Sequence, residues 1–413
     1  MMFGYIGKTL FSPTVVERKF DALCFNLILF DVFFLPLFPW FSVSISLPII
    51  CVWYLKKHSN TKHLPGHKYF PIITILMVIS TLFSIFNFQG SEYNTDFFTS
   101  FKRLIQYITS FWYFFFFLYF FVTYKRDVSN VVLCGIIYIF LYALLFTFSQ
   151  DTFILLKQTV CPFDPQVGRW LQGNMLQVYR FNYLWADPNN VAYASISLSL
   201  FYFNEKHNSL IKKYIVLLCL VYILVCTMSM GGIAVAAVLM SYVFIFTKLF
   251  RKGRYAILIS SIIILLIICG VIYYFDVLYQ IIDMTINVRL NMYGEEGISG
   301  GGGRGRDFMN GINKFNPLFL IIGSGKEGYV SEIGHIYIWY MYGLPVYIYF
   351  IYMLYWKRFK QTIREYISIV PLFVAFTMNI AIVEQKVLLI TLFISAYYFA
   401  KSYRSKCKVN SLF

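Results

Sequence analysis

The sequence predicts an all-α, polytopic integral membrane protein with about 12 transmembrane helices. Two observations favour this class: 59% of the 413 residues are hydrophobic while only 13% are charged, and the apolar residues gather in long runs. A soluble domain carries about 25% charged residues, and a soluble chain of this size could not bury so much apolar surface in one core. Lipid is the solvent in which this composition is stable.

Each predicted helix follows from one apolar run, since a helix needs about 20 such residues to cross the hydrocarbon layer. Tight turns join the first two runs and the two runs around Met230-Gly231. We interpret the whole chain, 1–413, as a single transmembrane domain. The expected spans lie near residues 20–36, 39–55, 70–88, 104–123, 131–149, 189–203, 214–229, 232–247, 256–275, 331–352, 366–381 and 385–400.

The lysine and arginine residues indicate the orientation of these spans. With the N-terminus placed in the cytoplasm, 24 of the 35 basic residues fall in short cytoplasmic segments, and every short connection on that side is basic. The positive-inside rule then places both termini in the cytoplasm. The formal net charge of +16 is therefore explained by topology, and no nucleic acid is expected as a partner.

Two long segments on the outer side are where we expect the function to lie. They cover residues 150–188 and 276–330, and eight of the basic residues on that side belong to them. Short turns would be enough to connect the helices, and long loops are translocated largely regardless of their charge. Two long cationic loops on an otherwise minimal chain therefore indicate a role at the outer face.

The first loop ends with an arginine and a short Asp-Pro-Asn element. Pro188 suits the first turn of a helix, and Asp187 or Asn189 can cap exposed backbone amides. One interpretation is an ordinary helix entry with aromatic residues at the membrane interface. The other adds Arg180, whose guanidinium forms bidentate hydrogen bonds, beside the amides of a helix N-terminus. That arrangement favours phosphate or pyrophosphate.

The second loop is rich in glycine between residues 297 and 305, and it carries Arg304 and Arg306. Glycine lets backbone N–H groups approach an anion closely, so this segment is a second candidate for an anion site. The alternative is a flexible linker whose arginines contact lipid headgroups.

No cofactor or metal motif is visible in the sequence. Gly323-Ser324-Gly325-Lys326 is not a Walker A motif, because Leu320 replaces its first glycine and Glu327 replaces its Ser or Thr. The eight cysteines have neither a disulfide framework nor the spacing of metal ligands. We therefore expect neither a cofactor nor a metal.

His335 lies at the outer end of the span that begins near residue 331. A lone histidine is more often structural than catalytic. At the membrane interface beside an arginine-rich loop, however, an imidazole can accept a proton near neutral pH. The other possible bases outside the membrane show no spacing that singles out a pair; they are Asp187, Glu295, Glu296, Asp307, Glu327 and Glu332.

Few charged residues lie within the spans. Asp31 is near the outer end of a short first span, where we expect it to be hydrated. Lys102 and Arg103 open the fourth span and either reach to the interface or join a phosphate site. Glu384 and Lys386 share the last outer turn and are expected to pair. A transporter would show more intramembrane charges or broken helices.

Taken in order, these elements resemble the O-antigen polymerase and O-antigen ligase superfamily, whose members have two enlarged periplasmic loops between many helices. In the first loop Arg180 precedes Asp187-Pro188-Asn189. The elements of the second loop follow in the order Gly305-Arg306, Pro317, Gly323-Ser324-Gly325, His335 with Tyr337, and Gly343.

The sequence departs from the family pattern at several positions. Ile336 stands where Asn is frequent, and Met230 stands where Arg is frequent. An aromatic residue usually follows the Gly-Arg element, and Phe308 is the nearest candidate. Arg304 would then match the family arginine, so the choice between Arg304 and Arg306 stays open.

The resemblance implies a GT-C-like glycosyltransferase fold in the bacterial inner membrane. The implied activity is a metal-independent, inverting glycosyl transfer at the periplasmic face. Donor and acceptor would be undecaprenyl-pyrophosphate-linked oligosaccharides, and a chain-length regulator would be a further protein partner. The residues implied as catalytic are His335, or one loop carboxylate in its place, with Arg306 and Arg180. Those implied in pyrophosphate binding are Arg180, Arg304, Arg306, Arg289 and Asn189.

Other functions remain as alternatives to a polymerase. The closest is the ligase of the same superfamily, which moves the glycan onto lipid A–core. A flippase for lipid-linked oligosaccharides is of a different class and would have a charged central cavity with short outer loops. Aromatic residues of the first loop are open to two interpretations, stacking on sugars or anchoring in the interface; they are Trp170, Tyr183 and Trp185.

Overall fold

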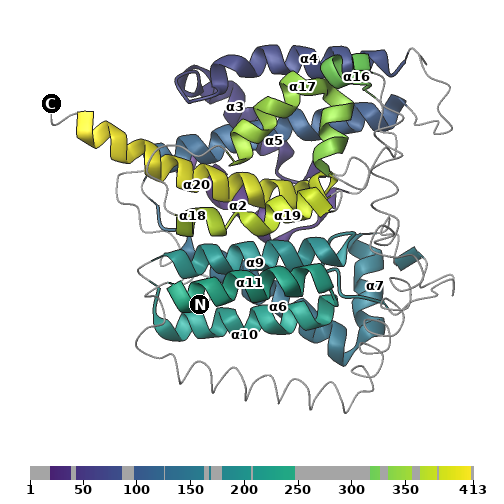
Figure 1. The fold of residues 1–413 in the computed structure, drawn as a ribbon, viewed down its shortest axis with the longest axis vertical. Coiled ribbons are helices and arrows are strands. Elements are labelled where there is room, and N and C mark those ends of the chain that lie inside the picture. Colours follow the sequence, from purple (N-terminus) through teal and green to yellow (C-terminus); the bar gives the residue numbers. More distant parts are fainter. Residues whose placement is uncertain are drawn as a thin grey trace. The chain divides into compact units, whose positions relative to one another are not determined.

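The structure is a computed structural model of the full chain. The described part is all-α apart from one two-stranded ribbon (Figure 1). The expected span at 256–275 and most of the loop 276–330 lie outside the described residues. These are residues 19–38, 43–85, 97–124, 126–161, 167–168, 179–205, 208–246, 317–325, 334–355, 363–378 and 381–410.

Four described helices are long and apolar enough to cross a membrane, which indicates a multi-pass membrane protein. By length and composition they are α5 (Phe97–Thr123), α6 (Ser129–Phe148), α10 (Leu210–Thr227) and α17 (Gly334–Tyr355), the last of which is broken at Gly343. Large apolar side chains also stand on the outside of the helices, for example Leu55, which is 81% exposed, and Val238, which is 68% exposed. Such exposure is costly in water and is expected of helices whose solvent is lipid.

The chain divides into two compact units. The first contains Met1–Val128, Gly303–Ile363 and Leu372–Phe413, and the second contains Ser129–Gly302 and Arg364–Pro371. Arg180 and Asn189 therefore belong to the second unit, whereas His335 belongs to the first.

Helix α5 forms the centre of the first unit. It is contacted by α3 (Leu47–Thr61), α4 (Phe70–Phe83) and α20 (Gln385–Asn410), and α2 (Lys19–Phe34) lies against α3 and α20. Aromatic side chains fill the space between these helices. Phe25 of α2 stacks on Phe120 with ring centroids 3.7 Å apart, and Phe393 of α20 meets Phe117 edge-on at 5.4 Å. The abundance of phenylalanine in the sequence thus has a direct use in packing α5.

A short β-ribbon separates α2 from α3. Strand β1 (Leu37–Phe38) pairs antiparallel with β2 (Val43–Ser44). The second helix then begins at Leu47, with a proline in its first turn, so our expectation of a span from residue 39 is wrong. The first-turn proline sets the start of this helix, because proline is tolerated where the N–H has no helical partner. Ser44 and Ser46 are thereby placed beside the end of α2.

Helix α17 is not a straight span. Gly343 has φ 82° and ψ 173°, values outside the helical region, and Pro345 follows two residues later. In a straight helix His335 and Tyr355 would be about 30 Å apart along the axis, whereas their ring centroids are 5.7 Å apart. The two halves of α17 therefore fold back on each other, and the expectation of one continuous span at 331–352 is wrong.

The carbonyl groups freed at this break are satisfied by the Gly323-Ser324-Gly325 segment, which follows α16 (Pro317–Ile322). The N–H of Ser324 donates to Tyr340 O at 2.8 Å, and the N–H of Gly325 donates to Met341 O at 2.9 Å. Within an apolar environment a broken helix needs such internal partners. The Gly-Ser-Gly motif of the sequence is therefore a backbone clamp on α17.

Three glycines make this approach possible. A Cβ atom at Gly343 would lie 2.3 Å from Ile321 O, and one at Gly323 would lie 2.5 Å from the carbonyl carbon of Tyr342. Gly325 is the tightest: its φ is +67°, and an added Cβ would overlap the backbone oxygen of Ser80 in α4 at 1.7 Å. Only glycine fits at these three positions.

The expected span at 366–381, which passes from the second unit into the first at Leu372, is interrupted. It contains α18 (Ile363–Ile367), α19 (Val370–Met378) and the 3₁₀ turn η5 (Ala381–Val383). Another 3₁₀ turn, η1 (His67–Tyr69), leads into α4.

In the second unit α6 packs against α7 (Gln150–Val160), α9 (Pro188–Asn204) and α10. Helix α11 (Met230–Phe246) packs on α9. Nearly all of α9 is buried, and many of its residues are small or hydroxylated, which lets neighbouring helices approach closely. The expected outer loop 150–188 therefore begins with a regular helix, α7.

The clamp on α17 can be tested with Gly325→Ala. The added methyl group would overlap the α4 backbone and occupy an unfavourable φ, so we expect a destabilisation of about 3 kcal/mol or more. The measurement is the melting temperature of the detergent-purified protein. Gly168→Ala is the matched control, because nothing lies within 4 Å of its Cβ position. Equal melting temperatures of the two variants would contradict the proposed clamp.

Candidate functional site

Arg180 is held at the C-terminal end of α10. Its Nε donates to Thr227 O at 3.0 Å, and its Nη2 donates to Met228 O at 3.1 Å. Met228 has a φ of 47° and forms the left-handed cap of that helix. The guanidinium thus lies at the negative end of the α10 dipole, where a cation is stabilised. This contact fixes the half-buried Arg180 before any ligand is present.

Asn189 joins Arg180 to the start of α11. Its Oδ1 accepts a hydrogen bond from Arg180 Nη2 at 3.3 Å and another from Ser229 Oγ at 2.7 Å. Ser229 Oγ in turn accepts from the N–H of Gly232 at 3.2 Å. The carboxylate of Asp187 accepts from the N–H of Asn189 at 2.7 Å, which caps the N-terminus of α9. The capping role predicted for Asp187 is confirmed.

The N-termini of α9 and α11 therefore meet beside one arginine. Two glycines of α11 permit this: a Cβ at Gly231 would lie 2.6 Å from the hydroxyl of Tyr193, and one at Gly232 would lie 2.7 Å from Cβ of Ala192. Each helix N-terminus carries a partial positive charge. At α9 the N–H of Asn189 already donates to the Asp187 carboxylate, and at α11 the N–H of Gly232 donates to Ser229 Oγ. The guanidinium and the two helix N-termini thus form a positive cluster beside one carboxylate, that of Asp187. We call Arg180, Asn189, Ser229 and the first turns of α9 and α11 the Arg180 cluster.

The loop leading into α9 is tied down by a second cation, which is the part of the site that sequence reasoning missed. Lys157 of α7 is only 1% exposed, and its Nζ donates to Trp185 O at 2.7 Å. Because Lys157 lies in the long outer segment, its charge suggested solvent exposure. The sequence signal that could have indicated an inward-pointing Lys157 side chain is the position of this residue on a regular helix, α7.

The aromatic residues of this loop serve as core. Tyr183 is 2% and Trp185 3% exposed, their rings meet edge-on at 5.4 Å, and Tyr183 also contacts Tyr142. Burial raises the pKa of the Tyr183 phenol well above its ordinary value. These two rings are thus enclosed by protein, which argues against their use as sugar-stacking platforms. Trp170 lies outside the described residues.

His335 lies in an aromatic enclosure of the first unit. Its ring centroid is 5.1 Å from Phe373, 5.7 Å from Tyr355 and 6.2 Å from Tyr347. The side chain is 7% exposed, and within the described part of the chain neither ring nitrogen has a hydrogen-bond partner. An imidazole buried without partners is unfavourable, so this position is unusual. Its role as a base stays a prediction.

The structure does not place the remaining predicted site residues in the Arg180 cluster. Arg289, Arg304 and Arg306 lie outside the described residues, as do the possible bases Glu295, Glu296, Asp307, Glu327 and Glu332. Arg103 donates to Gln106 Oε1 at 2.7 Å and to Val383 O at 3.2 Å, so it supports η5 in the first unit.

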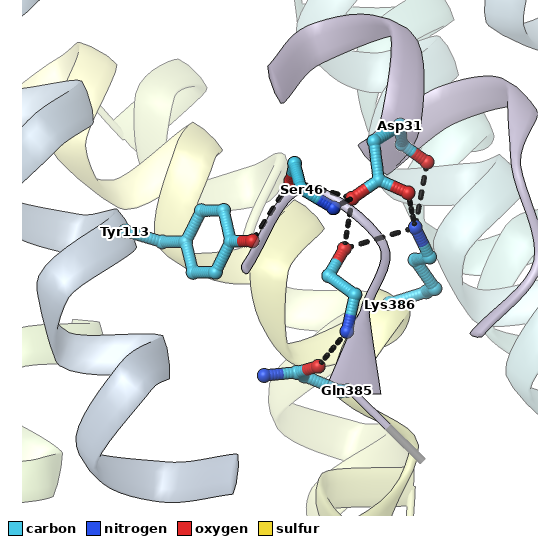
Figure 2. A network of polar contacts seen from close by, with 6 residues as sticks. Asp31, Ser46, Tyr113, Gln385 and Lys386 are labelled. Carbon is cyan, nitrogen blue, oxygen red and sulfur yellow. Dashed lines mark hydrogen bonds and ion pairs between the residues drawn. The ribbon is translucent and has the colours of Figure 1, made fainter. Parts of the chain in front are cut away.

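The most extensive polar network is in the first unit, around an ion pair that the sequence did not indicate. Nζ of Lys386 lies 2.6 Å from Oδ1 of Asp31, and the two side chains are 0% and 2% exposed. Figure 2 shows this pair at the junction of the first helix, the β-ribbon and α20. The expectation that Asp31 is hydrated is wrong. Among the described residues Lys386 pairs with Asp31 and not, as expected, with Glu384.

All three protons of Lys386 Nζ and both carboxylate oxygens of Asp31 take part in hydrogen bonds. Lys386 Nζ also donates to Asp31 O at 2.6 Å and Ser44 Oγ at 3.0 Å, which accounts for its three protons. Oδ2 of Asp31 accepts from the hydroxyls of Ser44 and Ser46 and from the N–H of Ser46. Tyr113 of α5 then donates to Ser46 Oγ at 2.8 Å, since the Ser46 proton is already engaged.

The network extends along the start of α20. Oε1 of Gln385 accepts from the N–H of Ser44 at 2.6 Å, and Nε2 lies 3.3 Å from Gln106 O in α5. Hydrogen bonds thus connect the β-ribbon and the start of α20 to α5. These contacts join α2, the β-ribbon, α5 and α20, which indicates a structural role for the network.

Comparisons with known proteins add no assignment, because no protein-family model, no curated protein and no solved structure matches this chain. What the described residues define is an all-α, multi-pass class of membrane protein with a preformed cationic cluster. The resemblance to polysaccharide polymerases and ligases stays a prediction.

The ion pair can be tested with Lys386→Met. The substitution leaves Asp31 buried without its counter-ion, and removal of one partner from a buried pair costs about 3–5 kcal/mol. We expect a lower melting temperature of the detergent-purified protein, with partial recovery in the double variant Asp31→Asn and Lys386→Met. Lys401→Met, at an exposed position of the same helix, is the control. No loss of stability in Lys386→Met would contradict the proposed pairing.

Proposed function

We propose that this protein is a membrane glycosyltransferase of the polysaccharide polymerase type. It would transfer the growing glycan from undecaprenyl pyrophosphate onto a new lipid-linked repeat unit at the outer face of the bacterial inner membrane. The proposal includes the twelve-span topology, the cytoplasmic termini and the metal-independent, inverting chemistry implied by the sequence resemblance.

The single observation that supports this proposal most is the convergence in the Arg180 cluster. A guanidinium and two helix N-termini meet there, and Asn189 links them through hydrogen bonds of 3.3 and 2.7 Å. Pyrophosphate is the leaving group in the proposed transfer. Negative charge develops on its oxygens in the transition state, and fixed donors that stabilise this charge lower the barrier. Because Arg180 is anchored by the carbonyls of α10, little reorganisation is needed when the lipid binds.

The proposed reaction balances without a metal. The hydroxyl of the acceptor sugar attacks the anomeric carbon of the donor, the bond to the pyrophosphate oxygen breaks, and that oxygen keeps the electron pair. His335 or a loop carboxylate accepts the hydroxyl proton. Arg180 stabilises the departing pyrophosphate, together with Arg306, Arg304 and Arg289 of the second loop. The released lipid pyrophosphate is a product.

One alternative is favoured by specific observations. Membrane transporters and flippases use broken helices and buried charges to bind and move their cargo. This chain has both, in the break of α17 at Gly343 and in the buried pair of Asp31 and Lys386. Against this alternative, the ion pair is fully hydrogen-bonded and offers no vacant position to a cargo. The ligase, which differs only in its acceptor, is the alternative within the same class.

A deletion strain complemented with Arg180→Ala tests the function. Loss of the anchored cation should reduce chain extension about 10²–10³-fold, so long chains should disappear from a gel of surface polysaccharide while the protein stays in the membrane. Arg404→Ala, in the expected cytoplasmic tail, is the control. Normal chain length in Arg180→Ala would contradict the proposed clamp.

The deletion strain itself distinguishes the classes. Single repeat units on the lipid core would support a polymerase. A bare core with accumulated lipid-linked polymer would instead indicate a ligase, and lipid-linked units retained on the cytoplasmic side would indicate a flippase.

The role of His335 can be separated from its packing with His335→Phe. A phenyl ring retains the aromatic contacts to Phe373 and Tyr355 but cannot accept a proton. If the imidazole is the base, turnover should fall about 10²–10⁴-fold while binding of the lipid-linked donor is retained. Wild-type turnover in this variant would place the base elsewhere, with the loop carboxylates as the next candidates. The measurement is single-turnover transfer in membranes, with donor binding measured in parallel.

A further inference from the structure

We propose that Tyr355 binds the attacking hydroxyl of the acceptor sugar together with His335, and that Phe373 is the movable cover of this subsite. The proposal rests on the proposed function, because this hydroxyl is the one that attacks the donor sugar. It is carried by two polar side chains of α17 that the fold brings together and leaves without hydrogen bonds.

His335 and Tyr355 meet because α17 folds back at Gly343. They are the second and the last residues of this helix, and their ring centroids are 5.7 Å apart. Both ring nitrogens of His335 and the hydroxyl oxygen of Tyr355 are buried, and within the described part of the chain none of these three atoms has a hydrogen-bond partner. The imidazole is 7% exposed, so bulk solvent does not reach it.

This burial is unfavourable for both side chains. A buried polar atom without a hydrogen bond loses its hydration and gains nothing in exchange. The surrounding contacts of His335 are aromatic, to Tyr347 and Phe373 among others, so an apolar ring would pack there as well and without this cost. The cost is offset when a ligand supplies the hydrogen bonds that the protein itself does not form.

A hydroxyl group fits these atoms better than an anion does. A neutral imidazole has one acceptor and one donor nitrogen, and a phenol hydroxyl both donates and accepts. An alcohol can therefore donate its proton to His335 while it accepts a hydrogen bond from Tyr355. A phosphate or carboxylate could not donate to the imidazole, and the ring contacts of His335 among the described residues are with uncharged aromatic side chains.

Phe373 of α19 stands between this pair and the outside. Its ring centroid is 5.1 Å from that of His335, and the residue is 45% exposed, whereas Phe376 on the same helix is completely buried. Exposed side chains change rotamer rapidly. A rotation of Phe373 thus uncovers the imidazole while the helices keep their packing.

The proposed step assigns each side chain one task. The hydroxyl proton passes to a nitrogen of His335 while the hydroxyl oxygen forms the bond to the anomeric carbon. The bond to the pyrophosphate oxygen breaks, and that oxygen keeps the electron pair. Tyr355 keeps its own proton and holds the attacking oxygen through a hydrogen bond.

Tyr355→Phe tests this hydrogen bond. The variant keeps the ring contact to His335 and loses one contact to the acceptor, so transfer should fall about tenfold. The melting temperature of the detergent-purified protein should stay the same or rise, because a buried hydroxyl without a partner has been removed. Tyr403→Phe is the control, since it removes a phenol hydroxyl at an exposed position of α20.

Phe373→Ala tests the cover without any substrate. Diethyl pyrocarbonate acylates neutral imidazoles, and peptide mass spectrometry measures the rate at each histidine. We expect His335 of the wild type to react more slowly than the exposed His63, and its rate to rise about tenfold in Phe373→Ala. Ile348→Ala, at an exposed position of α17, is the control. Equal rates at His335 in the wild type and in Phe373→Ala would overturn the role of Phe373.

Single-turnover transfer in membranes decides the role of Tyr355, with lipid-linked oligosaccharide extracted from the deletion strain as the substrate. Reduced transfer by Tyr355→Phe at an undiminished melting temperature, with normal transfer by Tyr403→Phe, would support the subsite. Wild-type transfer by Tyr355→Phe, when Arg180→Ala loses transfer, would overturn it and leave the proposed function standing. A lower melting temperature of Tyr355→Phe would reveal a structural hydroxyl and also overturn it. Absence of transfer by the wild type would remove the proposed function, and this subsite with it.

Discussion

A polar group inside an apolar helical bundle must find its partner within the protein, and much of the described architecture follows from this constraint. Asp31 and Lys386 are 355 positions apart in the chain, yet each supplies the other's counter-ion. The serines of the β-ribbon, Tyr113 of α5 and Gln385 of α20 complete the shell. The fold of the first unit therefore depends on a contact between the beginning and the end of the chain.

At the break in α17, backbone polar groups likewise need hydrogen-bond partners within the protein. The carbonyls of Tyr340 and Met341 lose their helical partners where Gly343 leaves the helical conformation, and the amides of Ser324 and Gly325 replace them. Glycine is required because the two backbones approach to distances that no side chain allows. A motif that resembles a phosphate-binding signature in the sequence is thus explained by helix packing.

The apolar runs were sufficient to predict the positions of α2, α4, α6, α9, α10 and α11 to within several residues, and the start but not the end of α20, because length and hydropathy determine a buried helix. The fold-back of α17 was not predicted: Gly343 and Pro345 are visible, but the apolar pattern continues across them. The pairing of Asp31 with Lys386 was not predictable either, since no local rule links such distant residues. At the candidate site, Asp187 as a cap followed from local chemistry, whereas Ser229 and Lys157 required the packing of separate helices.

The two polar assemblies differ in a way that bears on function. In the Asp31–Lys386 network every donor and acceptor of the ion pair is engaged within the chain, and such a closed set stabilises a single arrangement. In the Arg180 cluster the carboxamide oxygen of the partly exposed Asn189 accepts two hydrogen bonds, and within the described part of the chain its Nδ2 donates none. Burial and charge alone would rank the ion pair first as a site. Counting the unused hydrogen bonds reverses that order, because a ligand can bind only where the protein has left donors or acceptors for it.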